Sequence, residues 1–269
     1  MKNNLVIYCV TNKKSGFLEN LNLKLAGVGQ EQFDEKYISS KTGVNIHHKE
    51  SYYSELTFHY WFWKNLLKTH NKDTWIGFCQ KRRFWVRENI KDSEVDLSNF
   101  ENYLLREPDN SWKNYDAIIC DKIDLSKVKK MKLLKRSFRS FIKKPSLFFG
   151  KNNGSIKLHF DMHHGYGNLE KAISVMKSEH KNLFLEYVLK SKSYNPHIMF
   201  ISKPYIINKW FDDLFSWLDK CEKIFGFTDL KGYDTQRLYA FLAERYLSFW
   251  FKKNTRYLEW PWIFFDTTK

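Results

Sequence analysis

The clearest chemical signal in the sequence is a pair of arginines at the end of an apolar run. Residues 75–85 read WIGFCQKRRFW, so the apolar run passes directly into Gln80, Lys81, Arg82 and Arg83. Guanidinium groups bind phosphates and carboxylates through paired hydrogen bonds. An arginine pair at a strand end therefore suits a phosphate or pyrophosphate, although such pairs also occur in ordinary surface ion pairs.

Further polar side chains recur at helical spacing. Glu55 and His59 lie four residues apart, on one face of an expected helix. Arg237 and Glu244 share a face of a second expected helix, two turns apart. A structural ion pair through neighbouring residues is the alternative interpretation of the second pair.

These residues need elements to position them, and short apolar runs alternate with longer helical patterns along the chain. We expect strands at residues 5–10, 74–79, 116–120, 198–202 and 257–265. We expect helices at residues 52–68, 168–176, 181–190, 205–225 and 235–251. The alternation favours an α/β architecture with a helical C-terminal half.

Three expected strands end at a cysteine that polar residues follow at once. The cysteines are Cys9, Cys79 and Cys120. If the strands are parallel neighbours, the polar residues emerge together at the carboxyl edge of one sheet, where open α/β sheets bind ligands. The alternative is that small cysteines end buried strands and the polar residues form ordinary loops.

Length and composition limit the class of protein. The chain has 269 residues, enough for one large domain or two closely packed ones, and its 43% hydrophobic content is unlike that of a disordered chain. No apolar run reaches the roughly 20 residues of a membrane-spanning helix. The four cysteines form no CxxC pair, which argues against a zinc ribbon or a disulfide scaffold. The net charge of +15 favours an anionic partner: nucleic acid, a membrane surface or a phosphorylated substrate.

Residues 122–157 differ from the rest of the chain in charge. Lysines and arginines are interleaved there with large apolar residues, and Asp124 is the only acid. This pattern is typical of an amphipathic element that lies on anionic lipid. A nucleic-acid-binding segment and a solvated basic loop are the alternatives.

Several motifs occur in an order that resembles one protein family. The first two are SELTFHYWFWKN at residues 54–65 and IGFCQKRRFW at residues 76–85. A Met-Phe-Ile segment follows at residues 199–201, and RLYAFLAER at residues 237–245. Together they resemble a bacterial family of capsular and exopolysaccharide glycosyltransferases, long catalogued as a domain of unknown function, with galactofuranosyltransferase-like members. The resemblance extends from near residue 5 to near residue 265.

Three positions depart from the family's pattern. Gln80 and Lys81 replace a His-Tyr pair, Ile198 replaces an asparagine, and Ala240 replaces a glycine. The first change adjoins the arginine pair, so we expect it to alter the sugar or phosphate contacts most directly.

The resemblance implies a glycosyltransferase with a GT-A-like, nucleotide-sugar-binding sheet flanked by helices. It implies one domain over residues 1–269, with a basic amphipathic insert at about 122–157. The expected donor is a nucleoside-diphosphate sugar, namely a UDP-sugar with UDP-galactofuranose as a candidate, and the expected acceptor is a polyprenyl-linked glycan of capsule, O-antigen or exopolysaccharide. We expect a cytoplasmic protein, peripheral at the inner face of the plasma membrane, that contacts anionic lipid through the insert and binds no nucleic acid.

The resemblance also assigns roles to residues. Arg82 and Arg83 would hold the donor diphosphate. The other expected contacts with the nucleotide-sugar are Thr11, Asn12, Asn45, Tyr53, Glu55, Arg237 and Arg245. An inverting transferase needs a base on the acceptor hydroxyl. The candidate bases are Asp121 and Glu244, followed by His163 and Asp161.

The sequence leaves two possibilities for neutralising the departing diphosphate. A metal usually does so through an Asp-x-Asp motif, which this chain lacks. We expect Arg82, Arg83 and Arg245 to take that role in a reaction that requires no cofactor. The alternative is Mn²⁺ or Mg²⁺ with Asp121 as its ligand.

Two other functions compete with glycosyl transfer. A nucleic-acid-binding protein would use the same basic insert, but the sequence contains no recognisable nucleic-acid module. Another α/β transferase, such as a methyltransferase, would fit the fold class, but the glycine-rich loop after the first strand is missing.

Overall fold

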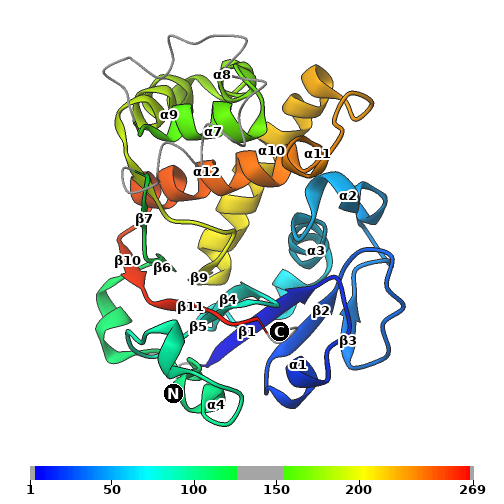
Figure 1. Cartoon of the computed structure of the whole chain (residues 1–269), viewed down its shortest axis with the longest axis vertical. Helices are drawn as coiled ribbons and strands as arrows, with labels where there is room; N and C mark the ends of the chain where they lie inside the picture. The colour runs from blue at the N-terminus through cyan, green and yellow to red at the C-terminus, as the bar shows by residue number, and fades with distance from the viewer. Residues whose placement is uncertain (1–3, 126–153, 267–269) are drawn as a thin grey trace. The chain divides into compact units, whose positions relative to one another are not determined.

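The computed structural model describes residues 4–125 and 154–266 (Figure 1). The chain divides into two compact units, each assembled from separated parts of the sequence. Unit 1 comprises residues 1–121, 197–212 and 251–269, and unit 2 comprises residues 122–196 and 213–250. Most of the predicted basic insert, from residue 126 to residue 153, lies outside the described residues.

Unit 1 is built on a mostly parallel sheet. Its strands are β1 (Leu5–Thr11), β2 (Lys24–Gly27), β3 (Tyr37–Ser39), β4 (Trp75–Gln80), β5 (Arg83–Trp85), β6 (Ala117–Cys120), β9 (Phe200–Ser202), β10 (Tyr257–Trp260) and β11 (Trp262–Phe264). The strand order is β10-β6-β9-β4-β1-β2-β3, and β5 joins β4 to β11. Neighbouring strands are parallel throughout this order except at β9, which is antiparallel to both β4 and β6. The predicted α/β class is confirmed.

Helices flank this sheet and make up most of unit 2. Unit 1 contains α1 (Gly16–Asn20), α2 (Glu50–Tyr53), α3 (Leu56–Trp61), α4 (Phe100–Tyr103) and the short turns η1 (His47–Lys49), η2 (Phe62–Leu66), η3 (Leu67–Thr69), η4 (Asp92–Glu94) and η5 (Asn110–Asn114). Unit 2 contains α7 (Ile156–His164), α8 (Asn168–Ser174), α9 (Ser178–Lys190), α11 (Tyr233–Gln236) and a hairpin of β7 (Ile123–Asp124) and β8 (Ser193–Tyr194). α10 (Pro204–Phe225) and α12 (Leu238–Asn254) contribute residues to both units.

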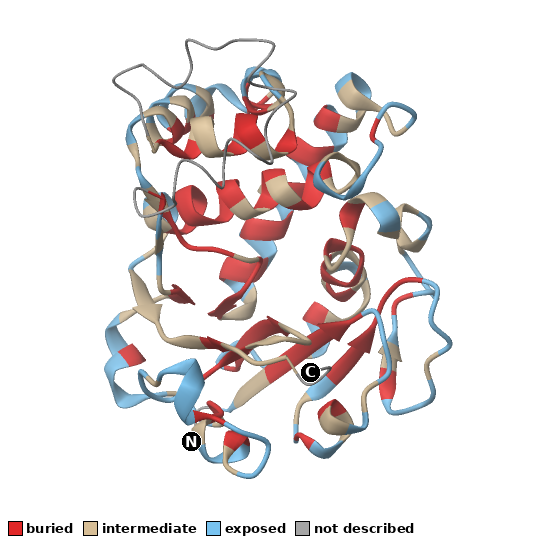
Figure 2. Cartoon of the chain, viewed as in Figure 1, coloured by how far each residue is buried: buried red, intermediate tan, exposed pale blue. Residues whose placement is uncertain are grey.

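One face of the sheet in unit 1 is covered by aromatic side chains. Because side chains alternate along a strand, Tyr8 of β1, Phe78 of β4 and Phe200 of β9 all project to this face. They pack against rings from α3, η2 and the start of α10, namely Phe58, Phe62 and Phe211. These strands are buried along most of their length (Figure 2). The aromatic layer fixes where α3 sits against β4.

The opposite face carries the other alternate residues and a second apolar layer. Cys9 and Cys79 are register partners on β1 and β4, and both are buried there among apolar residues that include Phe84, Phe100 and Trp112. Burial raises the pKa of the Cys79 thiol well above its usual value, which keeps that cysteine protonated. All four cysteines are free and buried, as the absence of paired spacing indicated.

The expectation that the three cysteine-ended strands are neighbours is only partly correct. β1 and β4 pair directly, but β9 lies between β4 and β6. Because β9 runs antiparallel to both neighbours, β4 and β6 still point the same way, and their carboxyl ends reach the same edge. Apolar periodicity identifies a strand such as β9 without giving its direction, so the insertion could not be deduced from the pattern.

The predicted helix at residues 52–68 is interrupted. α2 ends before Ser54, whose φ of 54° and ψ of −130° are not helical, and α3 starts two residues later. After α3, the chain continues as a π-helical turn and a 3₁₀ turn. Apolar spacing could not reveal a backbone break that depends on a single residue.

The predicted strand at residues 257–265 is also divided. β10 pairs with β6 in parallel, whereas β11 pairs with β5 in antiparallel fashion. Pro261 separates the two strands, and a proline has no N–H with which to continue the ladder. The C-terminal segment thereby brings β11 and Asp266 beside the turn that carries the arginine pair.

Candidate functional site

The arginine pair lies in a tight turn at the carboxyl end of β4. Gln80 and Arg83 face each other as the antiparallel pair that joins β4 to β5, so Lys81 and Arg82 form the two-residue loop between them. The backbone N–H of Lys81 donates to the carbonyl of Val10 in β1 at 3.2 Å. The turn is therefore fixed at the edge where the parallel strands β1 and β4 both end.

A chain of polar side chains runs through this turn. The amide of Gln80 donates to Glu55 Oε1 at 2.5 Å, and Gln80 Oε1 accepts from Arg83 Nη1 at 3.2 Å. Arg83 Nε donates to His197 Nε2 at 3.0 Å, which requires that this ring nitrogen be unprotonated. The side chain of Arg83 is thereby held from two directions.

Unusual backbone conformations occur at both ends of this series of hydrogen-bonded side chains. Ser54, next to Glu55, has a φ of 54°, and His197 has a φ of 65°. They are the only residues other than glycine with positive φ in the described part of the chain. Such conformations cost on the order of 1–3 kcal/mol and persist where the surrounding structure requires them, often at functional sites. Glu55 and His197 thus hold the network in place at an energetic cost.

Arg82 points to a different partner. Its Nη1 donates to Asp266 Oδ2 at 3.1 Å, and its guanidinium lies 5.7 Å from the centre of the Phe264 ring. Asp266 is only 10% exposed, whereas the side chain of Arg82 is 41% exposed. Among the described residues, Arg82 Nε has no hydrogen-bond partner. The guanidinium is therefore oriented by a carboxylate while part of it remains accessible.

The end of β1 supplies further polar groups to the same edge. Asn12 is exposed, and its Oδ1 accepts from Lys81 Nζ at 2.6 Å. Thr11 is buried, and its hydroxyl forms hydrogen bonds with the backbone of Lys13, which shape the loop after β1. Asn12 therefore joins the turn directly, and Thr11 supports the loop that carries it.

The remaining predicted residues of unit 1 lie in other settings. Asp121 directly follows β6, is half-buried, and its N–H donates to the carbonyl of Trp260 at 3.0 Å. Asn45 forms hydrogen bonds with backbone atoms of its own loop, those of Lys41, Gly43 and His47. The ring of Tyr53 is only 2% exposed. Of these three residues, Asp121 follows a strand that ends at the same edge as β1 and β4.

Unit 2 contains a separate cluster around Arg245, which is 2% exposed. Its guanidinium forms an ion pair with Glu244 and lies 4.5 Å from the centre of the Tyr194 ring. Its Nη2 also approaches His159 Nδ1 at 3.3 Å and His164 Nε2 at 3.5 Å. The predicted residues Glu244 and Arg245 thus bind each other in a buried pair.

Burial and charge keep the two histidines of this cluster neutral. Desolvation, reinforced by the charge of Arg245, lowers the pKa of His159 to about 2 and that of His164 well below its usual value. His163 packs beside them, with its ring centroid 4.6 Å from that of His159. Neutral imidazoles accept hydrogen bonds from the guanidinium, so they complete the environment of Arg245.

Two other predicted residues of unit 2 have local partners. Arg237 Nη1 donates to the hydroxyl of Tyr233 at 3.2 Å. Asp161 is 1% exposed, accepts from Lys157 Nζ at 2.6 Å and also accepts from the N–H of Gly167. Burial raises the pKa of the Asp161 carboxyl, although Lys157 acts in the opposite direction. Asp161 thus stabilises the end of α7 and the turn that follows it.

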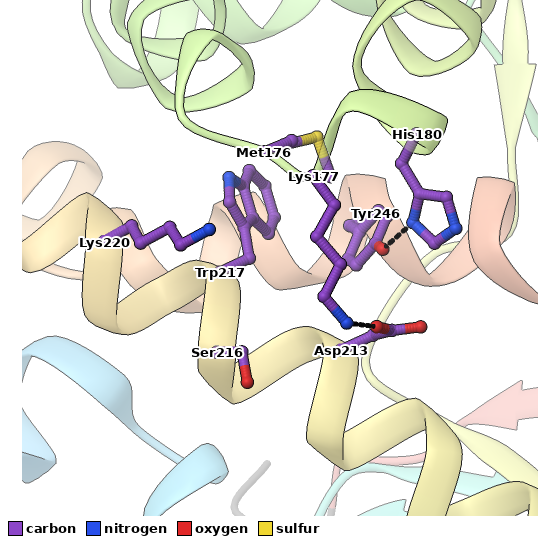
Figure 3. Close-up of a pocket in the computed structure, with 8 residues that line it drawn as sticks. All are labelled: Met176, Lys177, His180, Asp213, Ser216, Trp217, Lys220 and Tyr246. Carbon is purple, nitrogen blue, oxygen red and sulfur yellow. Dashed lines mark hydrogen bonds and ion pairs between the residues drawn. The ribbon is translucent and has the colours of Figure 1, made fainter.

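A small pocket in unit 2 was not indicated by the sequence (Figure 3). Four of its polar groups are joined in two pairs: Lys177 Nζ donates to Asp213 at 2.5 Å, and His180 Nδ1 lies 2.6 Å from the hydroxyl of Tyr246. Desolvation raises the pKa of the Tyr246 hydroxyl. These pairs link α9, α10 and α12, which gives the pocket a structural role.

Sequence reasoning missed two residues at the carboxyl edge, His197 and Asp266. His197 precedes a strand whose antiparallel direction was unknown, so nothing placed it beside Arg83. Asp266 follows an aromatic segment, and only the pairing of β11 with β5 brings it to Arg82. In both cases the missing information was strand order and direction.

The described residues contain no group of three or more histidine, cysteine or acidic side chains that could hold a metal ion. Asp121, the predicted ligand at the carboxyl edge, does not belong to such a group. Within residues 4–125 and 154–266, no helix is both long and apolar enough to cross a membrane.

Comparison with known proteins places the chain in a family. The sequence matches the family model described as Domain of unknown function (DUF4422) over residues 6–255. The chain belongs to this family. A comparison with curated proteins gives no match.

The fold of this DUF4422 chain is similar to that of a solved protein. That structure is described as the WbbM bifunctional glycosyltransferase in its apo form, and the two share 19% sequence identity with a TM-score of 0.70. The match covers 98% of this chain and 46% of the other, so the chain spans about half the length of that protein. The likeness extends the α/β assignment to a GT-A-like fold with a central sheet flanked by helices.

Proposed function

We propose that this protein is a glycosyltransferase that binds a nucleoside-diphosphate sugar at the carboxyl edge of the sheet in unit 1. The observation that carries the proposal is the turn between β4 and β5, where Lys81, Arg82 and Arg83 stand side by side and are oriented by neighbouring side chains. Fixed cationic groups stabilise the charge that develops on a departing diphosphate. The GT-A-like fold supports this reading, because ligands of open α/β sheets bind at this edge.

The roles of the three cations follow from their partners. The side chain of Arg82 is 41% exposed and would contact the diphosphate directly. Lys81 would add a second positive charge, and Arg83, held by Gln80 and His197, would keep the turn in shape. Asn12 and the loop after β1 would contact the nucleoside.

The proposed reaction is transfer of the sugar to an acceptor hydroxyl. A base takes the proton of that hydroxyl, its oxygen bonds to the anomeric carbon, and the bond from that carbon to the diphosphate breaks. The nucleoside diphosphate then leaves with the bonding electrons. We propose Asp121 as the base, because it follows β6 at the edge where β1 and β4 end. Glu244 already balances the buried charge of Arg245, and His163 remains a further candidate.

We derive no step through a metal ion. Asp121, the predicted metal ligand, does not stand in a group of three potential ligands among the described residues. Mn²⁺ and Mg²⁺ are therefore tested as additives in the binding experiment below.

The finer proposal concerns the two substrates. The donor would be a UDP-sugar, with UDP-galactofuranose as one candidate, and the acceptor a polyprenyl-linked glycan of a surface polysaccharide. The basic segment at residues 122–157 would hold the protein at an anionic membrane surface, where such an acceptor resides. Flotation with liposomes that contain anionic lipid tests this step. Replacing Lys129, Lys130, Lys132 and Lys135 with glutamate should abolish co-flotation, and unchanged flotation would contradict the membrane contact.

The binding proposal is tested by calorimetric titration with UDP, UMP and uridine, each without metal, with Mn²⁺ and with Mg²⁺. If the cations contact the diphosphate, affinity should fall in the order UDP, UMP, uridine, by about tenfold or more between UDP and uridine. Equal affinity for the three compounds would contradict a diphosphate site. Binding only of DNA or RNA, lost steeply with salt, would favour the nucleic-acid alternative. Transfer itself is tested by the release of UDP from a panel of UDP-sugars.

A further inference from the structure

Unit 1 has a pocket at the opposite edge of its sheet. The pocket has a volume of about 840 Å³ and is lined by the amino-terminal residues of β1, by Trp75 at the start of β4, and by Asp116 just before β6. The loop that contains η5 and the first residues of α10 complete its wall. This pocket is therefore separated from the β4–β5 turn by the length of the parallel strands.

Tyrosines give this pocket accessible aromatic faces. Tyr205, the second residue of α10, is 53% exposed, and Tyr115, directly after η5, is half-buried. Trp75 lies deeper and is covered by Lys203, whose Nζ is 4.2 Å from the centre of its ring. The Lys203 ammonium also donates to the carbonyl of Asp73. The accessible aromatic surface of the pocket is thus tyrosine.

The polar part of the lining consists largely of planar groups. Asp116 binds Arg256 in a bidentate pair, with both oxygen–nitrogen distances at 3.1 Å. Asp109 and Asn110 are exposed, and Asp109 uses one carboxylate oxygen to hold Ser111 through two hydrogen bonds. Arg106 is anchored to the carbonyl of Asn22 at 3.0 Å. Several of these groups are therefore held in place before any ligand arrives.

The formal charge of the lining is close to balance. Four cations line the pocket, Arg106, Lys113, Lys203 and Arg256, against three acids, Glu107, Asp109 and Asp116. A site for a polyanion would show a clear excess of cations. A site for an apolar ligand would be lined mostly by hydrophobic side chains with few polar groups. The lining fits neither class.

We propose that this pocket binds a carbohydrate chain. A sugar ring presents a face of C–H groups, which are attracted to the negative face of an aromatic ring, and a rim of hydroxyls that both donate and accept hydrogen bonds. Exposed tyrosine beside fixed carboxylates, an amide and guanidinium groups matches both features. The proposal goes beyond glycosyl transfer, because it concerns binding at the other edge of the sheet and holds whether or not the protein is an enzyme.

The test uses the full chain on a printed array of neutral and uronic-acid oligosaccharides, followed by titration of the oligosaccharide that is retained. We expect the unmodified protein to retain at least one oligosaccharide. Tyr205→Ala should weaken that binding at least fivefold, because it removes the exposed ring. Tyr166→Ala is the matched control, since Tyr166 is an exposed tyrosine of unit 2, and it should bind as the unmodified protein does.

Three results would overturn the proposal. One is that the array retains no oligosaccharide. Another is that Tyr205→Ala binds as tightly as the control while its thermal unfolding is unchanged. The last is that UDP displaces the oligosaccharide competitively, which would assign the binding to the carboxyl edge. A second variant, Asn110→Ala, at an exposed loop position, guards against a folding defect and should also weaken binding.

Discussion

The two edges of the sheet in unit 1 differ in how their charges are arranged. At the carboxyl edge, Lys81, Arg82 and Arg83 are consecutive, and neighbouring side chains, those of Asn12, Asp266 and His197, orient them. At the amino edge, cations and acids are mixed around an open pocket, and Asp116 and Arg256 form an ion pair. The carboxyl edge thus places three cations on one turn, with the carboxylates of Glu55 and Asp266 beside it, whereas the amino edge distributes polar groups around aromatic faces.

The difference shows how one sheet can serve two kinds of ligand. Concentrated, oriented cations favour a compact anion such as a diphosphate. Balanced planar groups beside tyrosine favour an extended neutral ligand. The carboxyl edge also carries the strained backbone at Ser54 and His197, whereas no residue that lines the amino-edge pocket has a positive φ. Among the described residues other than glycine, positive φ therefore occurs only at the edge for which we propose chemistry.

The largest expected effect comes from removing the ring beneath the arginine turn. Phe84 is fully buried in β5, and its ring packs on Phe100 at 5.0 Å. Phe84→Ala should lower the free energy of unfolding by about 3–5 kcal/mol, because it leaves a cavity in the core. Urea denaturation measures the loss, with Leu97→Ala, at an exposed position, as the control. A loss below about 1 kcal/mol would show that the turn does not depend on this packing.

A pair of arginine variants separates the two edges. Arg82→Ala should weaken UDP binding about tenfold or more, because it removes charge-assisted hydrogen bonds to the diphosphate. Arg106→Ala, at the amino-edge pocket, should leave UDP binding unchanged and weaken binding of the retained oligosaccharide. Titration calorimetry measures both. If the two variants weakened UDP binding equally, UDP binding could not be assigned to an anion site at the carboxyl edge.

Low pH should lower the free energy of unfolding, because a buried histidine of α3 is neutral in the folded protein. His59 of α3 is 1% exposed and packs on Phe78, and desolvation lowers its pKa to about 4. In the unfolded chain the same group titrates near 6.5. Because the unfolded chain binds a proton first, stability is complete above pH 6.5 and falls as the pH drops towards 4. The loss from this group at pH 5 should be about 2 kcal/mol.

His59→Phe tests the origin of that loss. The variant should show a shallower decline in unfolding free energy between pH 7 and pH 5 than the unmodified chain, because it lacks the titrating group. Chemical denaturation at several pH values gives the comparison. An identical decline in the two proteins would assign the acid sensitivity to other groups, such as His159 of unit 2, which has an even lower pKa.

The smallest effect is expected at the exposed pair of the amino edge. Arg256→Ala removes the bidentate partner of Asp116, but Arg256 is largely exposed, so stability should change little. Oligosaccharide binding should weaken several-fold, since Asp116 would lose its two hydrogen bonds from the guanidinium and keep the one from the backbone N–H of residue 256. Affinity and thermal unfolding measured on one preparation separate these outcomes. A large drop in stability with unchanged affinity for the oligosaccharide would show that the pair stabilises the fold and takes no part in binding.

The sequence predicted much of the framework that positions the site. The strands that end at Cys9 and Cys79 are parallel neighbours, and the polar residues that follow them do meet at one edge, because apolar runs and strand ends leave a clear pattern. No pattern in the sequence indicates the direction of β9. The contacts of Arg83 with His197 and of Arg82 with Asp266 depend on strand order, so sequence reasoning could not find them.

Helical spacing in the sequence did not predict the contacts of individual side chains. Glu55 and His59 do lie one turn apart at the start of α3, with the N–H of His59 donating to the carbonyl of Glu55, but their side chains have different partners: Glu55 bonds to Gln80 at the edge, and His59 is buried against aromatic rings. The break at Ser54 separates α2 from α3 just before these residues. Helical periodicity indicates which residues share a side of a helix but does not show where the helix begins.

Amide hydrogen exchange with and without UDP tests the central claim most directly. If the carboxyl edge binds the diphosphate, UDP should slow exchange in peptides that cover residues 9–16 and 78–86. Peptides that cover the amino-edge residues 106–116 should exchange at the same rate in both samples. Protection of the amino-edge peptides alone, or of neither region at saturating UDP, would contradict the account.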